Sequence, residues 1–509
     1  MSSTPGAGIH MGDAKRSGLR DLGVRQRFRR KVQQCLEVLE RMLAEDGFAR
    51  SEKSIGLELE LNLVDHKMRP AMNNDLVLST LNDSLFTTEV SQHNIELNVA
   101  PRPLAGNNFL DLEKDLNHNL RNASTAASES GTLVAMIGMI PTLTTADFDI
   151  KWLSNDARYT QLNDQIFHLR GEDTVLSIEG RPLGDGHQEK LKRQNQTILP
   201  EAAGTSLQLH LQVTPEEFAN HWNAAQCLAG PQVAIAGNSP FLLNKALWHE
   251  TRIPLFLQAT DTRSEELRNQ GVRPRVWFGE RWINSPLELF EENSRYFPGL
   301  LTDLDGEDPV ESWDAGKAPV LNELCLHNST IWRWNRPVYD VMDGVAHLRI
   351  ENRVLPAGPT VLDMMANAAF FYGAQRGLVE ADRPLWTEMS FSAAEENLYA
   401  GARDGFDAQL YWPKIGWLKP DELVLRILLP LAHEGLRRAE VSDEARERYL
   451  GVIEKRCLTR RTGSSWQREN VTRAKELGLD RETALTTMLA NYLELVDTGE
   501  PVHAWPLAA

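Results

Sequence analysis

The chain has 509 residues, of which 42% are hydrophobic and 25% are charged, and its formal net charge is -17. This composition is typical of a soluble globular enzyme, and the negative charge argues against a nucleic-acid-binding protein. The four cysteines lack the paired spacing of a disulfide framework or a zinc ribbon, which favours a reducing, cytoplasmic location. No apolar run is long enough for a membrane span or a signal peptide, so we expect no membrane partner.

The organisation along the chain predicts one large unit. We expect residues 1–22 to form a flexible N-terminus, because they are mostly small and polar, and residues 23–509 to form a single catalytic unit. Within it, a sheet-containing core is predicted over 23–390, with a long tryptophan-rich insertion at about 260–345. The remaining part, 391–509, is predicted to be helical.

Four segments alternate apolar and polar side chains and are therefore predicted to be strands. They are 55–64, 94–100, 206–213 and 347–354. Helical spacing of apolar residues predicts helices over 25–46, 108–130, 359–379, 390–410, 421–439 and 481–497. The helix at 359–379 opens with Thr360 and Asp363 in a capping-box arrangement. Strands scattered among helices predict an α+β fold, or an α/β fold if the strands are parallel.

The polar faces of the four predicted strands carry an unusual set of side chains. In chain order these are Glu58, Glu60, Glu96, His210, Arg349, Glu351 and Arg353. Taken singly, a strand with one polar face is most simply interpreted as half exposed on an antiparallel sheet. Solvent-facing strands, however, favour Thr, Lys and Arg mixed with Glu, and no lysine occurs here. If the strands share a sheet, these groups line one concave surface.

Such a surface suits metal-assisted phosphoryl transfer. Glu58 and Glu60 project the same way, roughly 7 Å apart along a strand, and each can hold a different divalent cation. Mg²⁺, with Mn²⁺ as the alternative, prefers oxygen ligands and substrate phosphates, and neutral His210 can add a nitrogen ligand. Arginines beside acids suit a transferring phosphoryl group. Because P-loop and kinase motifs are absent, we expect ATP to be held largely by two or three Mg²⁺ and by arginine.

Several segments together resemble the second family of glutamate–cysteine ligases and its carboxylate–amine ligase relatives. They are "IGLELELNLVD", "TEVSQHNIELNVAP", "GTSLQLHLQV", "GNSPF", "HLRIENRVLPAGPTVLDMMANAAF", "AAEENLYAGARDGFDAQL" and "TGSSWQREN". The resemblance covers about residues 52–475. It implies a glutamine-synthetase-like α+β fold, with a mainly antiparallel curved sheet flanked by helices.

The resemblance also implies a reaction and a set of site residues. ATP would phosphorylate the γ-carboxylate of glutamate, and the amine of cysteine or another amino acid would displace phosphate to form an amide, as in glutathione biosynthesis. The implied metal ligands are Glu58, Glu60, Glu89, Glu96, His210 and Glu351. Arg353 and Glu351 are the expected catalytic residues. Arg353 and Arg349 are expected to contact the nucleotide. Arg252 lies where the family places residues around the amino-acid substrate, with a surface arginine as the alternative, and Arg403 could reach phosphate or be a solvated helix residue.

Two departures from the family pattern concern this site. The third strand usually reads histidine–any–histidine, whereas here it reads Gln208–Leu209–His210. Glu89 also has the opposite parity to Glu96 in the alternating pattern, so a turn or bulge must separate them.

Alternatives remain open at this point. The same fold can transfer phosphate to another acceptor, or it can be an inactive nucleotide-binding homologue. Arg333 and Arg336, which lie among tryptophans, fit either a functional role or cation–π packing, and 462–468 is expected to be a loop. The sequence does not identify the amine acceptor or the oligomeric state, with which a homo-oligomer is compatible.

Overall fold

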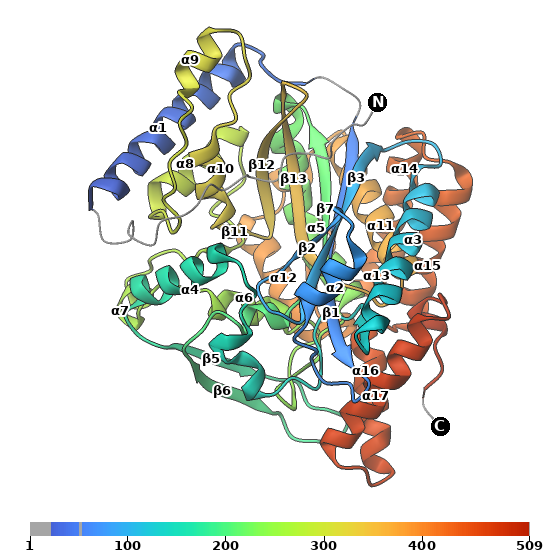
Figure 1. The fold of residues 1–509 in the computed structure, drawn as a ribbon. Coiled ribbons are helices and arrows are strands. Elements are labelled where there is room, and N and C mark those ends of the chain that lie inside the picture. Colours follow the sequence, from blue (N-terminus) through green and yellow to red (C-terminus); the bar gives the residue numbers. More distant parts are fainter. Residues whose placement is uncertain (1–21, 50–52, 508–509) are drawn as a thin grey trace.

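The computed structural model describes residues 22–49 and 53–507 (Figure 1). Apart from residue 22, the predicted N-terminal segment 1–22 lies outside the described residues. A seven-stranded sheet occupies the centre. Its strands, from one edge to the other, are β12 (Asn335–Met342), β13 (Val345–Pro356), β7 (Ser206–Val213), β1 (Ser54–Asp65), β3 (Asn94–Pro103) and β2 (Phe86–Thr88), and β4 (Thr132–Ala135) pairs with the end of β1.

All strand pairs within this sheet are antiparallel. The four strands predicted from alternation are β1, β3, β7 and β13, and each prediction is confirmed to within a few residues. Because the strands are antiparallel and helices flank them, the fold is α+β, as expected.

The apolar face of the sheet packs against two long, almost fully buried helices, α5 (Pro215–Ala236) and α11 (Val361–Val379). Leu57 and Leu209 on this face are at most 2% exposed. The alternation therefore has the physical cause inferred from it: one face of each strand is buried against helices, and the polar side chains lie on the other face.

The hydroxyl of Tyr372 in α11 anchors two neighbouring strands. It donates to the carbonyl oxygen of His210 at 2.9 Å and contacts that of Gly56 at 3.2 Å. The backbone of β7 and β1 is thereby held to the helix at the level where the polar face carries His210.

Further helices cover α5 and α11, and those packed against α11 lie on the right of the sheet in Figure 1. Against α11 pack α3 (Asn108–Glu129), α14 (Leu429–Arg438) and α15 (Asp443–Thr459), and α12 (Phe391–Asp404) lies along α5. On the left, α1 (Leu22–Ala44) packs against α8 (Pro286–Tyr296), α9 (Pro309–Asp314) and α10 (Asn322–Ser329).

The other elements are shorter or lie toward the bottom of Figure 1. They are α2 (Asn74–Leu81), α4 (Ala157–Arg170), α6 (Arg252–Ala259), α7 (Glu265–Asn269), α13 (Pro420–Leu423), α16 (Gly463–Glu476), α17 (Arg481–Val496), and the paired strands β5 (Thr174–Glu179) with β6 (Lys190–Asn195), β8 (Phe241–Leu242) with β9 (Lys245–Ala246), β10 (Val276–Trp277) with β11 (Trp332–Arg333), and β14 (Leu410–Trp412) with β15 (Gly416–Leu418). A second apolar core joins α4, β5, β6, α16 and α17. Among the described residues, no helix is both long and apolar enough to cross a bilayer.

Three predicted elements differ from the structure. The helix expected over 390–410 ends at Asp404, because Gly405 has a φ of 54° that breaks the helical path. The helix expected over 421–439 is interrupted by a π turn before Pro430, which has no N–H to donate to the preceding turn. The expected loop at 462–468 instead begins α16, capped by the side chain of Thr462.

Candidate active site

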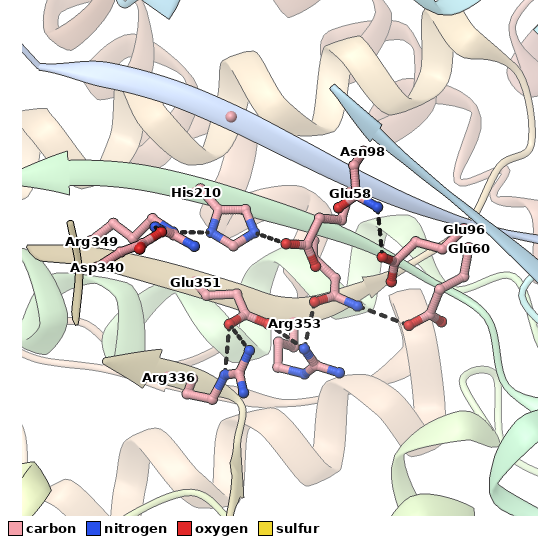
Figure 2. Close-up of polar contacts among 12 residues, drawn as sticks. Glu58, Glu60, Glu96, Asn98, His210, Arg336, Asp340, Arg349, Glu351 and Arg353 are labelled. Carbon is pink, nitrogen blue, oxygen red and sulfur yellow. Dashed lines mark hydrogen bonds and ion pairs between the residues drawn. The ribbon is translucent and has the colours of Figure 1, made fainter. Parts of the chain in front are cut away.

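Strand register brings the predicted polar side chains together on one face of the sheet (Figure 2). The directly opposed pairs are Glu58 with Gln208, Glu60 with Glu96, and His210 with Glu351. Side chains opposite each other on neighbouring strands lie about 5 Å apart at their Cβ atoms. Antiparallel pairing alone therefore places these groups, which are far apart in the sequence, within reach of one another.

Glu89 reaches the same face from outside a strand. It follows β2 directly, and the chain turns before β3 begins at Asn94. The turn predicted from the parity of Glu89 and Glu96 is therefore confirmed. The backbone N–H of Val90 donates to the Glu89 carboxylate at 3.1 Å.

The six predicted metal ligands form two groups of three. The first cluster is Glu58, His210 and Glu351, and the second cluster is Glu60, Glu89 and Glu96. Within each cluster, one potential ligand atom from every residue lies within 4.8 Å of the others. Three oxygen or nitrogen donors at this spacing could share a divalent cation, with water or phosphate oxygens as further ligands.

The first cluster is surrounded by arginines. Nε of Arg336 donates to Glu351 at 2.6 Å, and Arg353 donates to the other oxygen of the same carboxylate. Nε2 of His210 lies 3.0 Å from Glu58, and Nε of Arg349 donates to Nδ1 of His210 at 3.2 Å. This cluster therefore contains its own counter-charges.

These counter-charges decide the ionisation of the two acids. Burial alone would raise the pKa of Glu58, but His210 and Arg353 outweigh it and lower that pKa below its usual value of 4.5. The pKa of Glu351 is lowered further, because Arg336 and Arg353 more than offset the cost of burial. Both carboxylates are therefore ionised at neutral pH without a bound metal.

The second cluster consists of carboxylates alone. Its hydrogen bonds come from neutral donors: Ser206 N and Gln208 Nε2 donate to the two oxygens of Glu60 at 2.7 and 2.8 Å. The amide of Asn98 donates to Glu96 at 2.9 Å. Among the residues that the structure describes, no arginine or lysine lies within ion-pair distance of these three acids, and the charges of Arg353 and Arg252 act on Glu60 only from farther away.

The ionisation of the second cluster is opposite to that of the first. Burial, followed by repulsion from Glu60, raises the pKa of Glu89 to about 8. The pKa of Glu96 is also well above its usual range, because of burial and the neighbouring acids Glu58 and Glu89. In the absence of a cation, the second cluster therefore retains protons at neutral pH.

The two clusters fit divalent cations to different degrees. The all-oxygen second cluster suits Mg²⁺ or Mn²⁺ directly. In the first cluster, Nδ1 of His210 accepts from Arg349, so the hydrogen of a neutral imidazole lies on Nε2, beside Glu58. A cation at Nε2 requires the other tautomer, which releases Arg349 from this contact.

Arg353 lies where the two clusters meet. Its Nη1 contacts Glu351 of the first cluster and the side-chain oxygen of Gln208, whose nitrogen donates to Glu60 of the second. Its Nε is buried and has no hydrogen-bond partner among the described residues. An unpartnered guanidinium N–H beside two acid clusters is a fitting donor for an anionic group such as phosphate.

The other predicted ligand-binding arginines lie at three different places. Arg349 is near the first cluster, where Asp340 holds it at 2.9 Å. Arg252, at the start of α6, is 6% exposed and donates to the carbonyl oxygens of Arg353 and Val354, so it supports β13.

Arg403 is separated from both clusters. It pairs with Asp404 and lines a cavity of about 1410 Å³ between α12 and α16, and none of the six predicted metal ligands lines that cavity. Since no contact of the described residues joins Arg403 to the acids, the structure does not bring it to the candidate site.

Two residues near the clusters, Arg336 and Glu201, could not be assigned to the site from the sequence. Arg336 and Arg333 were indistinguishable in the sequence. Arg336 pairs with Glu351 in the first cluster, whereas Arg333 is buried against Trp277 and Glu292. Glu201, just before β7, lies close enough to Glu60 that burial and this neighbour raise its pKa to about 8. No periodic pattern marks Glu201, because it lies in a short 3₁₀ turn.

Comparisons with known proteins identify a family from the sequence and a similar fold from the structure. The sequence matches glutamate–cysteine ligase family 2 over residues 54–484. Among solved structures, glutamate–cysteine ligase from Francisella tularensis in complex with AMP has a TM-score of 0.50 at 12% identity, and the match covers 91% of this chain and 97% of that one. This likeness confirms the predicted fold, an antiparallel curved sheet flanked by helices.

Two further structures are less similar. A bifunctional glutathione synthetase from Pasteurella multocida has a TM-score of 0.43 at 11% identity, with 91% of this chain and 55% of that one covered. The complex of the prokaryotic ubiquitin-like protein Pup with its ligase PafA has a TM-score of 0.35 at 9% identity, with 86% and 71% covered. No curated protein matches the sequence at a significant level.

Proposed function

The chain belongs to glutamate–cysteine ligase family 2, and we propose that it joins a glutamate-type γ-carboxylate to the amine of an amino acid, with hydrolysis of ATP to ADP and phosphate. In this reaction the γ-carboxylate first accepts the terminal phosphoryl group of ATP. The amine then attacks the acyl phosphate, the C–O bond to phosphate breaks, and an amide forms. The nucleotide seen in the similar Francisella tularensis ligase supports an adenine nucleotide as substrate.

The two clusters are proposed to bind the metal ions of this reaction. The first cluster and the second cluster would each hold Mg²⁺, with Mn²⁺ as the alternative, through their carboxylate oxygens. When bound, such cations neutralise phosphate charge and orient the phosphates. The raised pKa of Glu89 and Glu96 supports this role for the second cluster, because three close carboxylates without protons need an external positive charge.

The protein's own contribution is centred on Arg353. Its buried, unpartnered Nε is available to donate to a phosphoryl oxygen, and Glu351 and Gln208 hold the guanidinium in place. A fixed donor of this kind stabilises charge that develops during transfer. No covalent bond to the protein is needed, since the acyl phosphate forms on the substrate.

The observation that carries the proposal is the convergence itself. Acids from three strands and one turn meet in two three-residue clusters, with one guanidinium between them. A half-exposed sheet face without a function has no reason to gather six potential ligands and leave an arginine N–H unpartnered.

The test is an ADP-release assay with Mg²⁺, ATP, glutamate and a panel of amino-acid amines including cysteine, followed by mass spectrometry of the products. Amine-dependent ADP release with a product of the mass of the amide supports the ligase. ADP release without an amide instead supports a phosphotransferase, and nucleotide binding without turnover supports an inactive homologue. The mass of the product identifies the amine.

A further inference from the structure

Gln208 occupies the junction between the two clusters. It lies on β7 opposite Glu58 and is 1% exposed. Its amide makes two side-chain contacts of opposite sense: Nε2 donates to Oε1 of Glu60 at 2.8 Å, and Oε1 accepts from Nη1 of Arg353. A single neutral side chain thereby connects an acid of the second cluster to the guanidinium that contacts the first.

The contact to Glu60 restrains a potential metal ligand. Both carboxylate oxygens of Glu60 accept a hydrogen bond, one from Gln208 and the other from the backbone N–H of Ser206 at 2.7 Å. A ligand that is already oriented loses less freedom when it binds a cation, and partners of ligating carboxylates contribute measurably to metal affinity.

The contact to Arg353 restrains the group proposed to face phosphate. Nη1 of Arg353 is shared between Gln208 and Glu351, which together fix the plane of the guanidinium and leave the buried Nε without a partner. Without Gln208, Glu351 alone would orient the guanidinium, and it could rotate about that remaining contact.

We propose that Gln208 is a positioning residue that orients Glu60 toward a cation and Arg353 toward a phosphate, and so couples the two clusters. The inference rests on the proposed function, because it assigns both ligands. A glutamine side chain provides the donor and the acceptor at once and cannot ionise, whereas methionine of similar size provides no donor and only a weak sulfur acceptor. A neutral histidine can also donate from one nitrogen and accept at the other.

The first experiment uses metal binding alone. Metal-free protein is titrated with Mn²⁺ for the wild type, Gln208→Met, Gln208→His and the control Gln232→Met. Gln232 is a matched control because it is 2% exposed and donates to Asn352 on the helix-covered side of the sheet. We expect Gln208→Met to weaken one Mn²⁺ site about 10- to 100-fold, Gln208→His to recover most of this loss, and Gln232→Met to bind Mn²⁺ like the wild type.

Two results would overturn the inference: Gln208→Met that binds Mn²⁺ with wild-type affinity, or Gln208→His that is as weak as Gln208→Met. The first result would show that the hydrogen bond from Gln208 to Glu60 does not affect metal binding. The second would show that side-chain shape, rather than hydrogen bonding, determines Mn²⁺ affinity. Thermal unfolding of each variant separates loss of metal binding from loss of fold, since Gln232→Met removes a buried hydrogen bond as well.

The second experiment uses turnover and a double-mutant cycle. We expect Gln208→Met to lower kcat about 10- to 100-fold with the KM for glutamate changed less than about twofold, and its effect to be non-additive with that of Arg353→Lys. Additive effects would contradict an action through Arg353. If the wild type forms no amide with any amine, the proposed function fails, while the Mn²⁺ titration still decides the contact to Glu60.

Discussion

The two clusters on the polar face of the sheet have the same number of potential ligands but opposite electrostatics. In the first cluster, Arg336 and Arg353 contact Glu351, and the pKa values of Glu58 and Glu351 are lowered. In the second cluster, neutral groups such as the Asn98 amide and the Ser206 N–H donate hydrogen bonds to the acids, and the pKa values of Glu89 and Glu96 are raised.

The difference in counter-charge determines which cluster needs a cation to balance its charge. The protein itself balances the charge of the first cluster, so its acids are ionised and ready for a cation. The second cluster holds protons in the absence of a cation, so the metal binding proposed there would displace those protons and would depend on pH. Mutations and metal removal should therefore act differently on two neighbouring parts of one surface.

The largest expected effect is on turnover. Glu58→Gln keeps the size of the side chain and removes one ligand charge, and we expect it to lower kcat/KM at least about 100- to 1,000-fold. The ADP-release assay measures this loss. Glu179→Gln, an exposed strand glutamate paired with Lys190, is the control and should retain wild-type activity. Full activity of Glu58→Gln at saturating Mg²⁺ would contradict the assignment of the first cluster.

The next prediction concerns the free energy of unfolding, which should respond differently to a substitution in each cluster. Glu351→Gln weakens the pairing of Arg336 and Arg353 with a buried carboxylate, and we expect it to lower the free energy of unfolding of the metal-free protein by about 3 kcal/mol. Glu96→Gln removes the cost of protonating a buried carboxylate on folding at neutral pH, so it should leave that free energy equal or slightly higher. Urea unfolding without metal measures both. Equal destabilisation by the two variants would show that the clusters do not differ in counter-charge.

A third effect concerns pH. The pKa of Glu89 is about 8 in the folded protein against 4.5 when unfolded. The folded state therefore binds a proton more tightly, and this contribution to stability is complete below pH 4.5 and lost as the pH rises to 8. We expect the free energy of unfolding of the metal-free protein to fall over this range, with a slope approaching about 1.4 kcal/mol per pH unit for one proton.

Saturating Mg²⁺ should reduce this slope, because the cation replaces the proton, and Mg²⁺ binding at pH 7 should release protons. Calorimetry in buffers of different ionisation enthalpy counts them. Glu89→Gln is the control and should show a smaller slope and a smaller release. A slope that is identical with and without Mg²⁺ would mean that the second cluster does not bind it.

The smallest effect is expected at Arg403. This arginine pairs with Asp404 beside a cavity that none of the six acids lines, so Arg403→Ala should change kcat/KM less than about twofold. A loss of tenfold or more would place the cavity in the reaction and would extend the comparison to a third region.

Much of this site could be predicted from the sequence because strands transmit position simply. Alternation assigns Glu58, Glu60, Glu96, His210 and Glu351 to one polar face, and antiparallel pairing then brings them together. Because Glu89 and Glu96 are an odd number of residues apart, the alternating pattern also predicts a turn or bulge between them, and the structure has a turn there.

The remaining features depend on contacts that no local pattern encodes. Gln208 and Arg336 contact partners on other strands, and Glu201, in a turn without periodicity, lies near enough to Glu60 for its charge to act on Glu201. Arg252 lies close to the site, but its guanidinium donates to the backbone carbonyl oxygens of Arg353 and Val354 in β13. Helix ends were misjudged where Gly405 and Pro430 act on the backbone rather than on the hydrophobic pattern.

The most direct test of two cation sites on one sheet face is anomalous scattering from crystals grown with Mn²⁺ and a non-hydrolysable ATP analogue. We predict one Mn²⁺ bound by oxygens of Glu58 and Glu351 and another bound by Glu60, Glu89 and Glu96, with phosphate oxygens completing the coordination and Arg353 donating to a phosphate. Crystals that contain the nucleotide but show no Mn²⁺ within bonding distance of either cluster would contradict this account.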